Sequence, residues 1–246
     1  MLGGDAKTAV AELTDRSALE KALAGVQSVF VVTGHNPSMA EQQNNVLDAA
    51  LNIWYGSAAA APWPRRRFRI GGGRGHAAIE ERLKASGIKW VILCPGPFMQ
   101  NVLDQAASIK TDSRMVLPFA KDLPVALIDV RDTGAVGARI LIDPAPHAGK
   151  TYEFTGKLTT YGAFAEVFSQ VLGRPIAYVG ITPEQAEQGM KARSMPDWLV
   201  AHLVTSAKLG AAGAFSTENI KLIEDLVGRP PITTKQFVED FKALFS

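Results

Sequence analysis

Cysteine is nearly absent from the sequence, which contains Cys94 and no other. One thiol cannot form an internal disulfide or a multi-thiolate metal site, so nothing implies an oxidising compartment and we expect a cytoplasmic protein. No apolar run is long enough to cross a bilayer. The N-terminus has neither a basic start with an apolar core nor a cleavage site. The sequence therefore predicts no membrane association and no signal peptide.

Motifs of several enzyme classes are missing too. No Gly-x-Ser-x-Gly, His-Glu-x-x-His, Cys-x-x-Cys or Walker sequence occurs, so hydrolase, zinc-site and nucleotide-triphosphatase functions have no supporting motif. The net charge is only +2, and five of the 26 basic side chains fall in residues 52–75, which contain no Asp or Glu. A single arginine-rich run is more typical of a solvated loop than of a basic face, so we expect no nucleic-acid partner.

Strand and helix patterns alternate along the rest of the chain. Strand patterns occur at residues 26–32, 88–93, 125–130 and 151–155, of which the first two read as buried strands. Helical patterns occur at residues 14–25, 38–50, 76–86, 133–142 and 161–172. Parallel strands need helical crossovers, so this alternation predicts an α/β doubly wound parallel sheet. From about residue 174 helical patterns dominate, and we expect a small helix-rich C-terminal region folded over the sheet.

Six segments, in this order, resemble the NmrA-like branch of the atypical short-chain dehydrogenase/reductases. They are AELTDRSALEKALAGVQSVFVVT, QQNNVLDAA, GRGHAAIEERLKASGIKWVILCPGPFMQN, LIDVRDTGAVGARILIDPAPHAGKTYEFTG, FSQVLGRPIAYVGITPE and LVGRPPITTKQFVEDFKALF. The resemblance implies a Rossmann-like NAD(P)-binding domain over residues 1–157 and a substrate-binding region over residues 158–246. It also implies an oxidoreductase that uses NADP or NAD, with NADPH favoured, to transfer hydride to a carbonyl, quinone or similar small acceptor. The alternative is a non-catalytic NAD(P)-sensing regulator of the NmrA type.

The sequence departs from this family at its start. Relatives begin with a strand, a Gly-x-x-Gly-x-x-Gly turn and a helix, whose backbone N–H groups hold the dinucleotide pyrophosphate. Here Gly3 and Gly4 are followed by Asp5 and no third glycine. We therefore expect an incomplete Rossmann-like domain that lacks the leading βαβ unit and binds its cofactor weakly. An uncovered strand edge would also promote self-association.

A second departure lies at residues 52–75, where relatives carry a buried strand and a Ser-containing loop. The segment is rich in Arg, Ala, Pro and Gly and contains no Val or Leu. This composition fits a local reading-frame shift, the interpretation we favour, or a divergent loop.

His76 is the candidate catalytic residue, by resemblance. It occupies the place of the active-site Lys of isoflavone-reductase-like relatives, eleven residues before Gly87. An imidazole there could protonate or polarise a substrate oxygen, or form a hydrogen bond with the nicotinamide ribose. The alternative is an exposed residue at a helix start with no function. Gly72 stands four residues before His76, so the Tyr-x-x-x-Lys pair of ordinary short-chain dehydrogenases is absent.

Two loops follow predicted central strands, at the edge where open α/β sheets bind ligands. By resemblance, the first contacts the adenosine and ribose side of the cofactor, and the second contacts the nicotinamide and the substrate. The expected cofactor residues are Thr33, Gly34, His35, Asn36, Pro37, Pro95, Gly96, Pro97 and Phe98; the expected substrate residues are Phe98, Met99 and Asn101. A plain turn for the first loop, and a core role for Phe98 and Met99, remain the alternatives.

Charged residues precede the predicted helix 133–142. Asp129 and Arg131 are interpreted as a structural ion pair, and Asp132 as the N-cap of that helix. Cys94 is expected to be an inert packing residue at a strand end.

Overall fold

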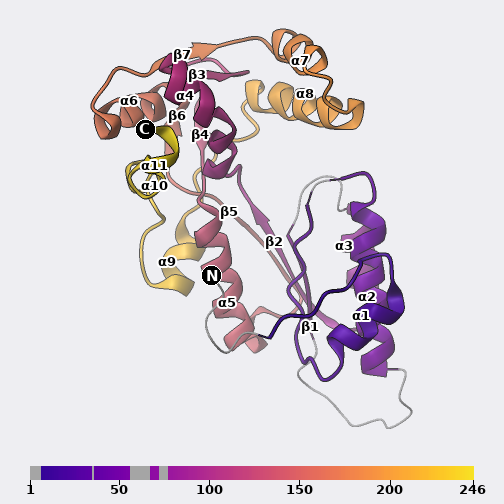
Figure 1. The fold of residues 1–246 in the computed structure, drawn as a ribbon. Coiled ribbons are helices and arrows are strands. Elements are labelled where there is room, and N and C mark those ends of the chain that lie inside the picture. The colour runs from indigo at the N-terminus through magenta and orange to yellow at the C-terminus, as the bar shows by residue number, and fades with distance from the viewer. Residues whose placement is uncertain (1–6, 35, 56–66, 72–76) are drawn as a thin grey trace. The chain divides into compact units, whose positions relative to one another are not determined.

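The computed structural model describes residues 7–34, 36–55, 67–71 and 77–246, with residues 54, 55, 67–71 and 77 described by their backbone. Helices and strands alternate over the first part of the chain, and helices dominate the last part (Figure 1). The helices are α1 (Arg16–Leu23), α2 (Met39–Tyr55), α3 (Ala77–Ala85), α4 (Ala106–Asp112), α5 (Val130–Ile142), α6 (Tyr161–Leu172), α7 (Pro183–Ala192), α8 (Asp197–Ala211), α9 (Lys221–Val227), α10 (Thr234–Asp240) and α11 (Lys242–Phe245), with 3₁₀ turns at Met99–Gln105 and Ala145–His147. The strands are β1 (Arg67–Gly71), β2 (Lys89–Pro95), β3 (Arg114–Leu117), β4 (Pro124–Ala126), β5 (Lys150–Phe154), β6 (Leu158–Thr160) and β7 (Ala177–Gly180).

The chain divides into two compact units. The first unit comprises residues 1–94 and 143–152, and the second unit comprises residues 95–142 and 153–246. The sequence-based domains, 1–157 and 158–246, stay a proposal about which segments bind cofactor and substrate.

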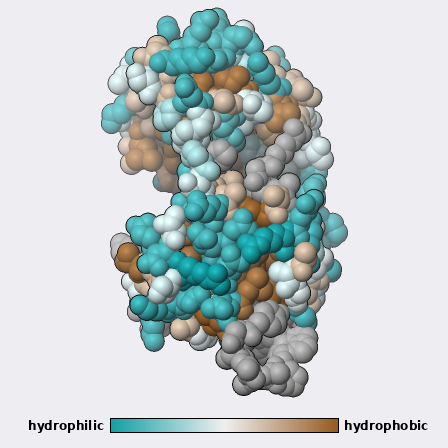
Figure 2. All heavy atoms as spheres, turned by 90° about the vertical axis from the view of Figure 1, so that its right-hand side faces the viewer, coloured by the Kyte–Doolittle hydropathy of each residue, from teal (hydrophilic) through white to brown (hydrophobic). Residues whose placement is uncertain are grey.

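The first unit packs helices on parallel strands. In the sheet of order β1-β2-β5, β1 pairs with β2 in parallel, with Arg67 opposite Lys89 and Gly71 opposite Leu93. Its core contains Leu47, Leu83 and Ile92, each 0% exposed. Arg82 of α3 forms an ion pair with Asp48 of α2 on the outer side. That outer side, which faces the viewer in the lower part of Figure 2, is largely hydrophilic.

The second unit contains two short strand pairs and most of the helices. β3 pairs with β7 in parallel, and β4 pairs with β6 in the antiparallel direction. Its aromatic core includes Phe164, Phe168, Phe237 and Phe245, all 0% exposed. Phe168 and Phe245 lie edge to face with ring centroids 4.7 Å apart, an arrangement that aromatic pairs favour. The terminal helix is therefore held by the core of this unit.

Several predicted elements form as expected. Helix α1 has Asp15 as its N-cap, which accepts a hydrogen bond from Ala18 N at 3.0 Å. Gly25 adopts φ +77° just after this helix, as C-terminal glycines do. Helix α6 covers residues 161–172 as predicted, and β2 and β5 occupy the predicted strand positions. The α/β class with parallel strands is confirmed.

Other predictions were wrong in detail. Residues 26–32 form isolated bridges at Ser28 and Val31 in place of a continuous strand. Val29 and Val31 are buried while Val32 is 70% exposed, so this segment is not covered along its whole length. The pair β4–β6 adds an antiparallel element to a fold predicted as parallel.

The described parts of residues 52–75 contain regular structure that was not predicted, while the reading-frame interpretation stays a hypothesis. Helix α2 continues to Tyr55, and Arg67–Gly71 forms strand β1. The sequence RFRIG alternates charged and apolar residues with the period of a strand. The segment thus supplies a strand in the register that a parallel sheet needs.

Candidate active site

The first predicted loop is tied to helix α2 by a buried amide. Gln43 is 1% exposed, and its Nε2 donates to Thr33 Oγ1 at 2.7 Å. A buried amide that donates to a loop hydroxyl fixes the end of the preceding segment. His35 of this loop lies outside the described residues.

Asn36 shapes the rest of that loop. Its Nδ2 donates to Gly34 O at 3.0 Å, and its Oδ1 accepts from Ser38 N at 2.9 Å. The second bond forms an Asx turn directly before α2. Pro37 is exposed beside it. Asn36 therefore serves as a turn residue, and its contacts agree with the plain-turn alternative as well as with a cofactor loop.

The second predicted loop leaves β2 and is fixed from two sides by backbone hydrogen bonds. On one side Gly96 N donates to Phe154 O at 2.8 Å. On the other side Ile128 N donates to Pro97 O at 3.0 Å. The loop thus lies between the end of β5 and residues 126–128, which restricts its backbone more than its short length alone would.

The side chains of this loop have different environments. Met99 is 2% exposed and packs in the core of the second unit, so the core alternative describes its contacts. Phe98 is half-buried and Asn101 is exposed. Phe98 forms a parallel bridge with Ile128, in which Met99 N donates to Ile128 O at 2.8 Å. Within the residues that the structure describes, the Phe98 N–H makes no hydrogen bond.

Two glycines allow the close packing around this loop. A Cβ on Gly96 would lie 2.8 Å from Thr155 Cγ2 and 3.1 Å from Ala126 O. A Cβ on Gly156 would overlap the Leu127 carbonyl oxygen. Both positions therefore require glycine for steric reasons. Gly156 directly follows β5 and a threonine, and a glycine after a predicted strand is the sequence signal that could have identified it.

Asp129 and Arg131 form the predicted ion pair at the start of α5. Arg131 Nε and Nη2 lie 2.9 and 2.8 Å from the two Asp129 oxygens, and Arg131 Nη1 lies 2.7 Å from Asp240 Oδ2. Burial by itself raises the pKa of Asp129, but hydrogen bonds from Arg131 and Gln100 outweigh it and hold that pKa below its usual value. A carboxylate engaged in this way stays ionised and is unsuited to proton transfer.

The assignment of Asp132 as the N-cap of α5 was wrong. The helix begins at Val130, and Asp129 Oδ1 accepts from Arg131 N at 2.8 Å, so Asp129 caps it. Asp132 is 0% exposed and lies within the first turn. Its Oδ2 accepts from Ile232 N at 2.9 Å, and its Oδ1 pairs with Arg229 Nη2 at 2.7 Å. Asp132 thus anchors the C-terminal segment to α5.

His76 lies outside the described residues, and its catalytic role stays a proposal. Cys94 packs partly buried against the core of the first unit, in agreement with a packing role. Within the described ranges, no group of His, Cys, Asp and Glu side chains could hold a metal ion. The helices of those ranges include none with the length and hydropathy of a membrane span.

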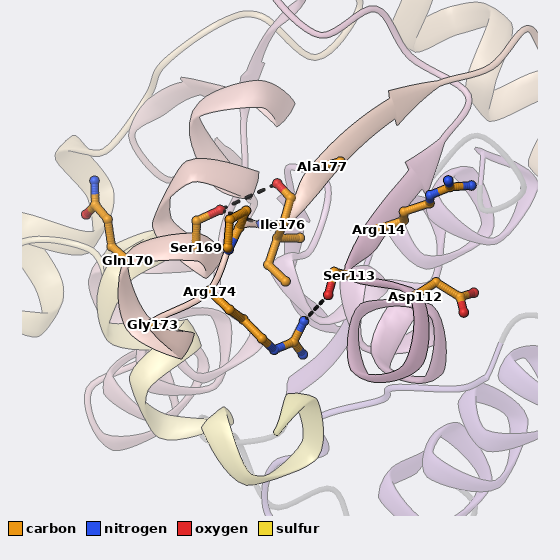
Figure 3. Close-up of a pocket in the computed structure, with 10 residues that line it drawn as sticks. Asp112, Ser113, Arg114, Ser169, Gln170, Gly173, Arg174, Ile176 and Ala177 are labelled. Carbon is orange, nitrogen blue, oxygen red and sulfur yellow. Dashed lines mark hydrogen bonds between the residues drawn. The ribbon is translucent and has the colours of Figure 1, made fainter.

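An open hollow of about 680 Å³ lies elsewhere in the second unit, between the ends of α4 and α6 and the starts of β3 and β7 (Figure 3). Arg174 extends through it toward Ser113 and donates to Ser113 Oγ at 2.5 Å, Ile109 O at 2.9 Å and Phe245 O at 3.1 Å. None of the predicted site residues that the structure describes lines this hollow. The guanidinium is engaged with helix C-terminal carbonyls, so we interpret the hollow as a structural junction.

Comparison with known proteins gives matches over most of the chain. The NmrA-like family profile matches residues 75–228, and an NAD(P)H-binding family profile matches residues 3–130. The NAD(P)H azoreductase of Xenophilus azovorans is 31% identical over 244 residues, which span 97% of this chain and 84% of that protein.

Solved structures share the fold. An NADPH-dependent quinone oxidoreductase from Escherichia coli, in complex with NADPH, aligns with a TM-score of 0.79 at 23% identity over 94% of this chain and 82% of that one. The triphenylmethane reductase of Citrobacter sp., in complex with NADP(H), aligns with a TM-score of 0.77 at 17% identity, over 94% and 82% of the two chains. These alignments confirm the Rossmann-like fold.

Proposed function

The chain belongs to the NmrA-like family, and from this premise we propose that it is an NAD(P)H-dependent reductase that transfers hydride to a carbonyl, quinone or similar small acceptor. The similar proteins support the acceptor class, because their names specify an azoreductase, a quinone oxidoreductase and a triphenylmethane reductase. Azo groups, quinones and the cations of triphenylmethane dyes are conjugated systems that accept hydride. NADPH is the favoured cofactor, since the quinone oxidoreductase and triphenylmethane reductase complexes contain NADPH or NADP(H), whereas a complex of the regulator NmrA contains NAD.

The proposal rests on the loop that leaves β2. Its backbone is held from two sides at Gly96 and Pro97, yet the Phe98 N–H has no partner within the described residues. A backbone donor that is held in place and has no partner among the described residues suits the carboxamide oxygen of a nicotinamide. Gly96 lets the loop pack closely against the Thr155 methyl group, and the half-buried Phe98 supplies apolar surface for a conjugated acceptor. The bound cofactor would supply the hydride.

His76 is proposed to complete the reaction with a proton. Hydride addition to a carbonyl or quinone leaves negative charge on the acceptor oxygen, and an imidazolium can neutralise it by proton donation. The near-neutral pKa of an ordinary histidine suits this role at physiological pH. Met99 would pack behind Phe98 in the core, and the exposed Asn101 would contact the acceptor.

Cofactor affinity is proposed to be weak. The 246 residues contain no Gly-x-x-Gly-x-x-Gly turn, and charge-assisted hydrogen bonds of that turn contribute roughly 1.5–3 kcal/mol each. Without two or three of them, the dissociation constant would rise on the order of a thousandfold or more. Titration of the purified chain with NADPH, followed by nicotinamide fluorescence, measures this directly. Micromolar binding would contradict the proposed impairment.

Turnover separates the reductase from the non-catalytic alternative. We expect slow, saturable NADPH oxidation when a soluble benzoquinone is added, and a corresponding reduction of the quinone. Binding of NADPH without reduction of quinone or azo acceptors would contradict the reductase and favour the dinucleotide-sensing regulator.

Two histidine variants test whether His76 is the proton donor. His76→Ala should lower kcat with quinone while the dissociation constant of NADPH changes little, because the imidazole acts on the acceptor oxygen. The control is His147→Gln, since His147 Nδ1 lies 2.7 Å from Tyr152 OH and glutamine retains a hydrogen-bonding group. Equal activities of the two variants would remove His76 from the mechanism.

A further inference from the structure

Residues 215–219 form hydrogen bonds with the two chain segments that flank the loop leaving β2. Ala126 N donates to Phe215 O at 2.8 Å, which joins the segment to β4. Thr155 N donates to Asn219 O at 2.9 Å, which joins it to the end of β5. These two chain segments supply the atoms that a Cβ on Gly96 would meet. The segment 215–219 therefore links both neighbours of the loop.

Thr155 connects this segment to the loop itself. Its Oγ1 accepts from Asn219 N at 2.7 Å and donates toward Thr217 O at 3.1 Å. Its methyl group lies 2.8 Å from the position that a Cβ on Gly96 would take. The hydroxyl thus fixes the rotamer of Thr155, and the fixed rotamer places the methyl group against the loop.

Exposed side chains hold the chain on both sides of Thr155. Asn219 Nδ2 donates to Glu153 O at 2.6 Å, and Glu218 Oε2 accepts from Leu158 N at 2.7 Å. Both side chains are exposed, and hydrogen bonds at exposed positions contribute little net stability because water competes for them. Because both hydrogen bonds lie next to Thr155 along the chain, we infer that their main effect is to fix the backbone position of Thr155.

We propose that Thr155 and Asn219 are positioning residues, which hold the backbone of Gly96, Pro97 and Phe98 where the nicotinamide and the acceptor meet. The inference rests on the reductase proposed above for the part that concerns catalysis. A displacement of about 1 Å in such a loop costs up to a hundredfold in rate, because hydride transfer requires a fixed distance and angle. No sequence pattern indicates this role, since Asn219 is distant from the loop along the chain.

Two threonine variants separate the hydroxyl from the methyl group. Thr155→Val keeps the shape but removes Oγ1, whereas Thr155→Ser keeps Oγ1. We expect Thr155→Val and Asn219→Ala to raise amide hydrogen exchange in a peptide covering residues 94–103, with exchange in α10 unchanged. Amide exchange of the same peptide in Thr155→Ser should be closer to the wild-type value than in Thr155→Val, because serine keeps the hydrogen bonds of Oγ1. The control is Thr205→Val, because the Thr205 hydroxyl donates to Ala201 O within α8 at 2.7 Å, away from the loop.

Kinetics with NADPH and benzoquinone complete the test. Thr155→Val should lower kcat/KM about ten- to a hundredfold and reduce the selectivity between the two hydrogens at C4 of stereospecifically deuterated NADPH. A merely structural role would leave that selectivity unchanged. Unchanged loop exchange in both Thr155→Val and Asn219→Ala would overturn the inference, whatever the activity. An inactive wild type would overturn the reductase proposal, while the exchange measurement would still decide whether these residues hold the loop.

Discussion

Asp132 offers a direct test of how the C-terminal segment is held. Its side chain is 0% exposed, and it faces an Arg229 side chain that is 41% exposed. Asp132→Asn can keep its one side-chain oxygen as the acceptor for Ile232 N, and its Nδ2 donors then face the guanidinium. Removal of one partner of a buried ion pair costs about 3–5 kcal/mol. Because Arg229 keeps contact with water, we expect a smaller loss of about 2–3 kcal/mol in the free energy of unfolding.

Thermal and urea unfolding measure this loss. For a chain of this size a loss of 1 kcal/mol lowers Tm by roughly 2–4 °C, so Asp132→Asn should unfold about 4–12 °C below the wild type. Asp132→Ala should be less stable still, because Ile232 N also loses its acceptor. The matched control is Asp225→Asn, which breaks the ion pair with Lys221, where the side chains are 55% and 79% exposed. That control should change stability by less than about 1 kcal/mol.

The outcome that would refute this reasoning is clear. If Asp132→Asn and Asp225→Asn unfold at the same urea concentration with the same m value, the buried pair contributes no more than an exposed one. The C-terminal segment would then depend on apolar packing alone.

Three further predictions concern Gly156, Arg174 and Asp129. Gly156→Ala should destabilise the protein by more than about 1–3 kcal/mol, because its Cβ would overlap the Leu127 oxygen; a wild-type Tm would contradict this. Arg174→Met should lower stability by about 2 kcal/mol, because three acceptors lose their donor, and urea unfolding measures the change. The lowered pKa of Asp129 stabilises the fold above the unfolded-state pKa near 3.8, and this contribution is lost as pH falls through the lower folded value. Asp129→Asn should therefore reduce the slope of unfolding free energy against pH below about pH 4, and an unchanged slope would exclude the Arg131 pair as its source.

Local patterns were sufficient for many elements and for the family. Helix α6 begins after Thr160, whose side chain accepts from Ala163 N, and ends at Gly173 with φ +69°. Such caps act within one turn of the helix, so the sequence specifies them without reference to the rest of the chain. The buried run of β2 was equally clear, because a strand covered on both faces is apolar throughout.

The loop that leaves β2 was also found from the sequence, but what holds it was not. Pro95, Gly96 and Pro97 mark a turn after a strand, and a turn signal is local. The contacts of Thr155 with Asn219, at 64 positions' separation, leave no periodic trace in the sequence. Exposed polar residues such as Asn219 look alike wherever they occur, so their partners can be recognised only in three dimensions.

The roles of Asp129 and Asp132 show the same division. The sequence by itself identified a carboxylate and an arginine at the start of α5, because charge and capping are properties of neighbouring residues. It assigned the helix cap to the wrong aspartate, since the choice of cap depends on where the helix begins. The tertiary structure decided it: Asp132 is buried against Ile232, 100 positions further along the chain. An uncompensated buried carboxylate is too costly to persist, so the fold places a backbone N–H and an arginine around it that no local pattern announces.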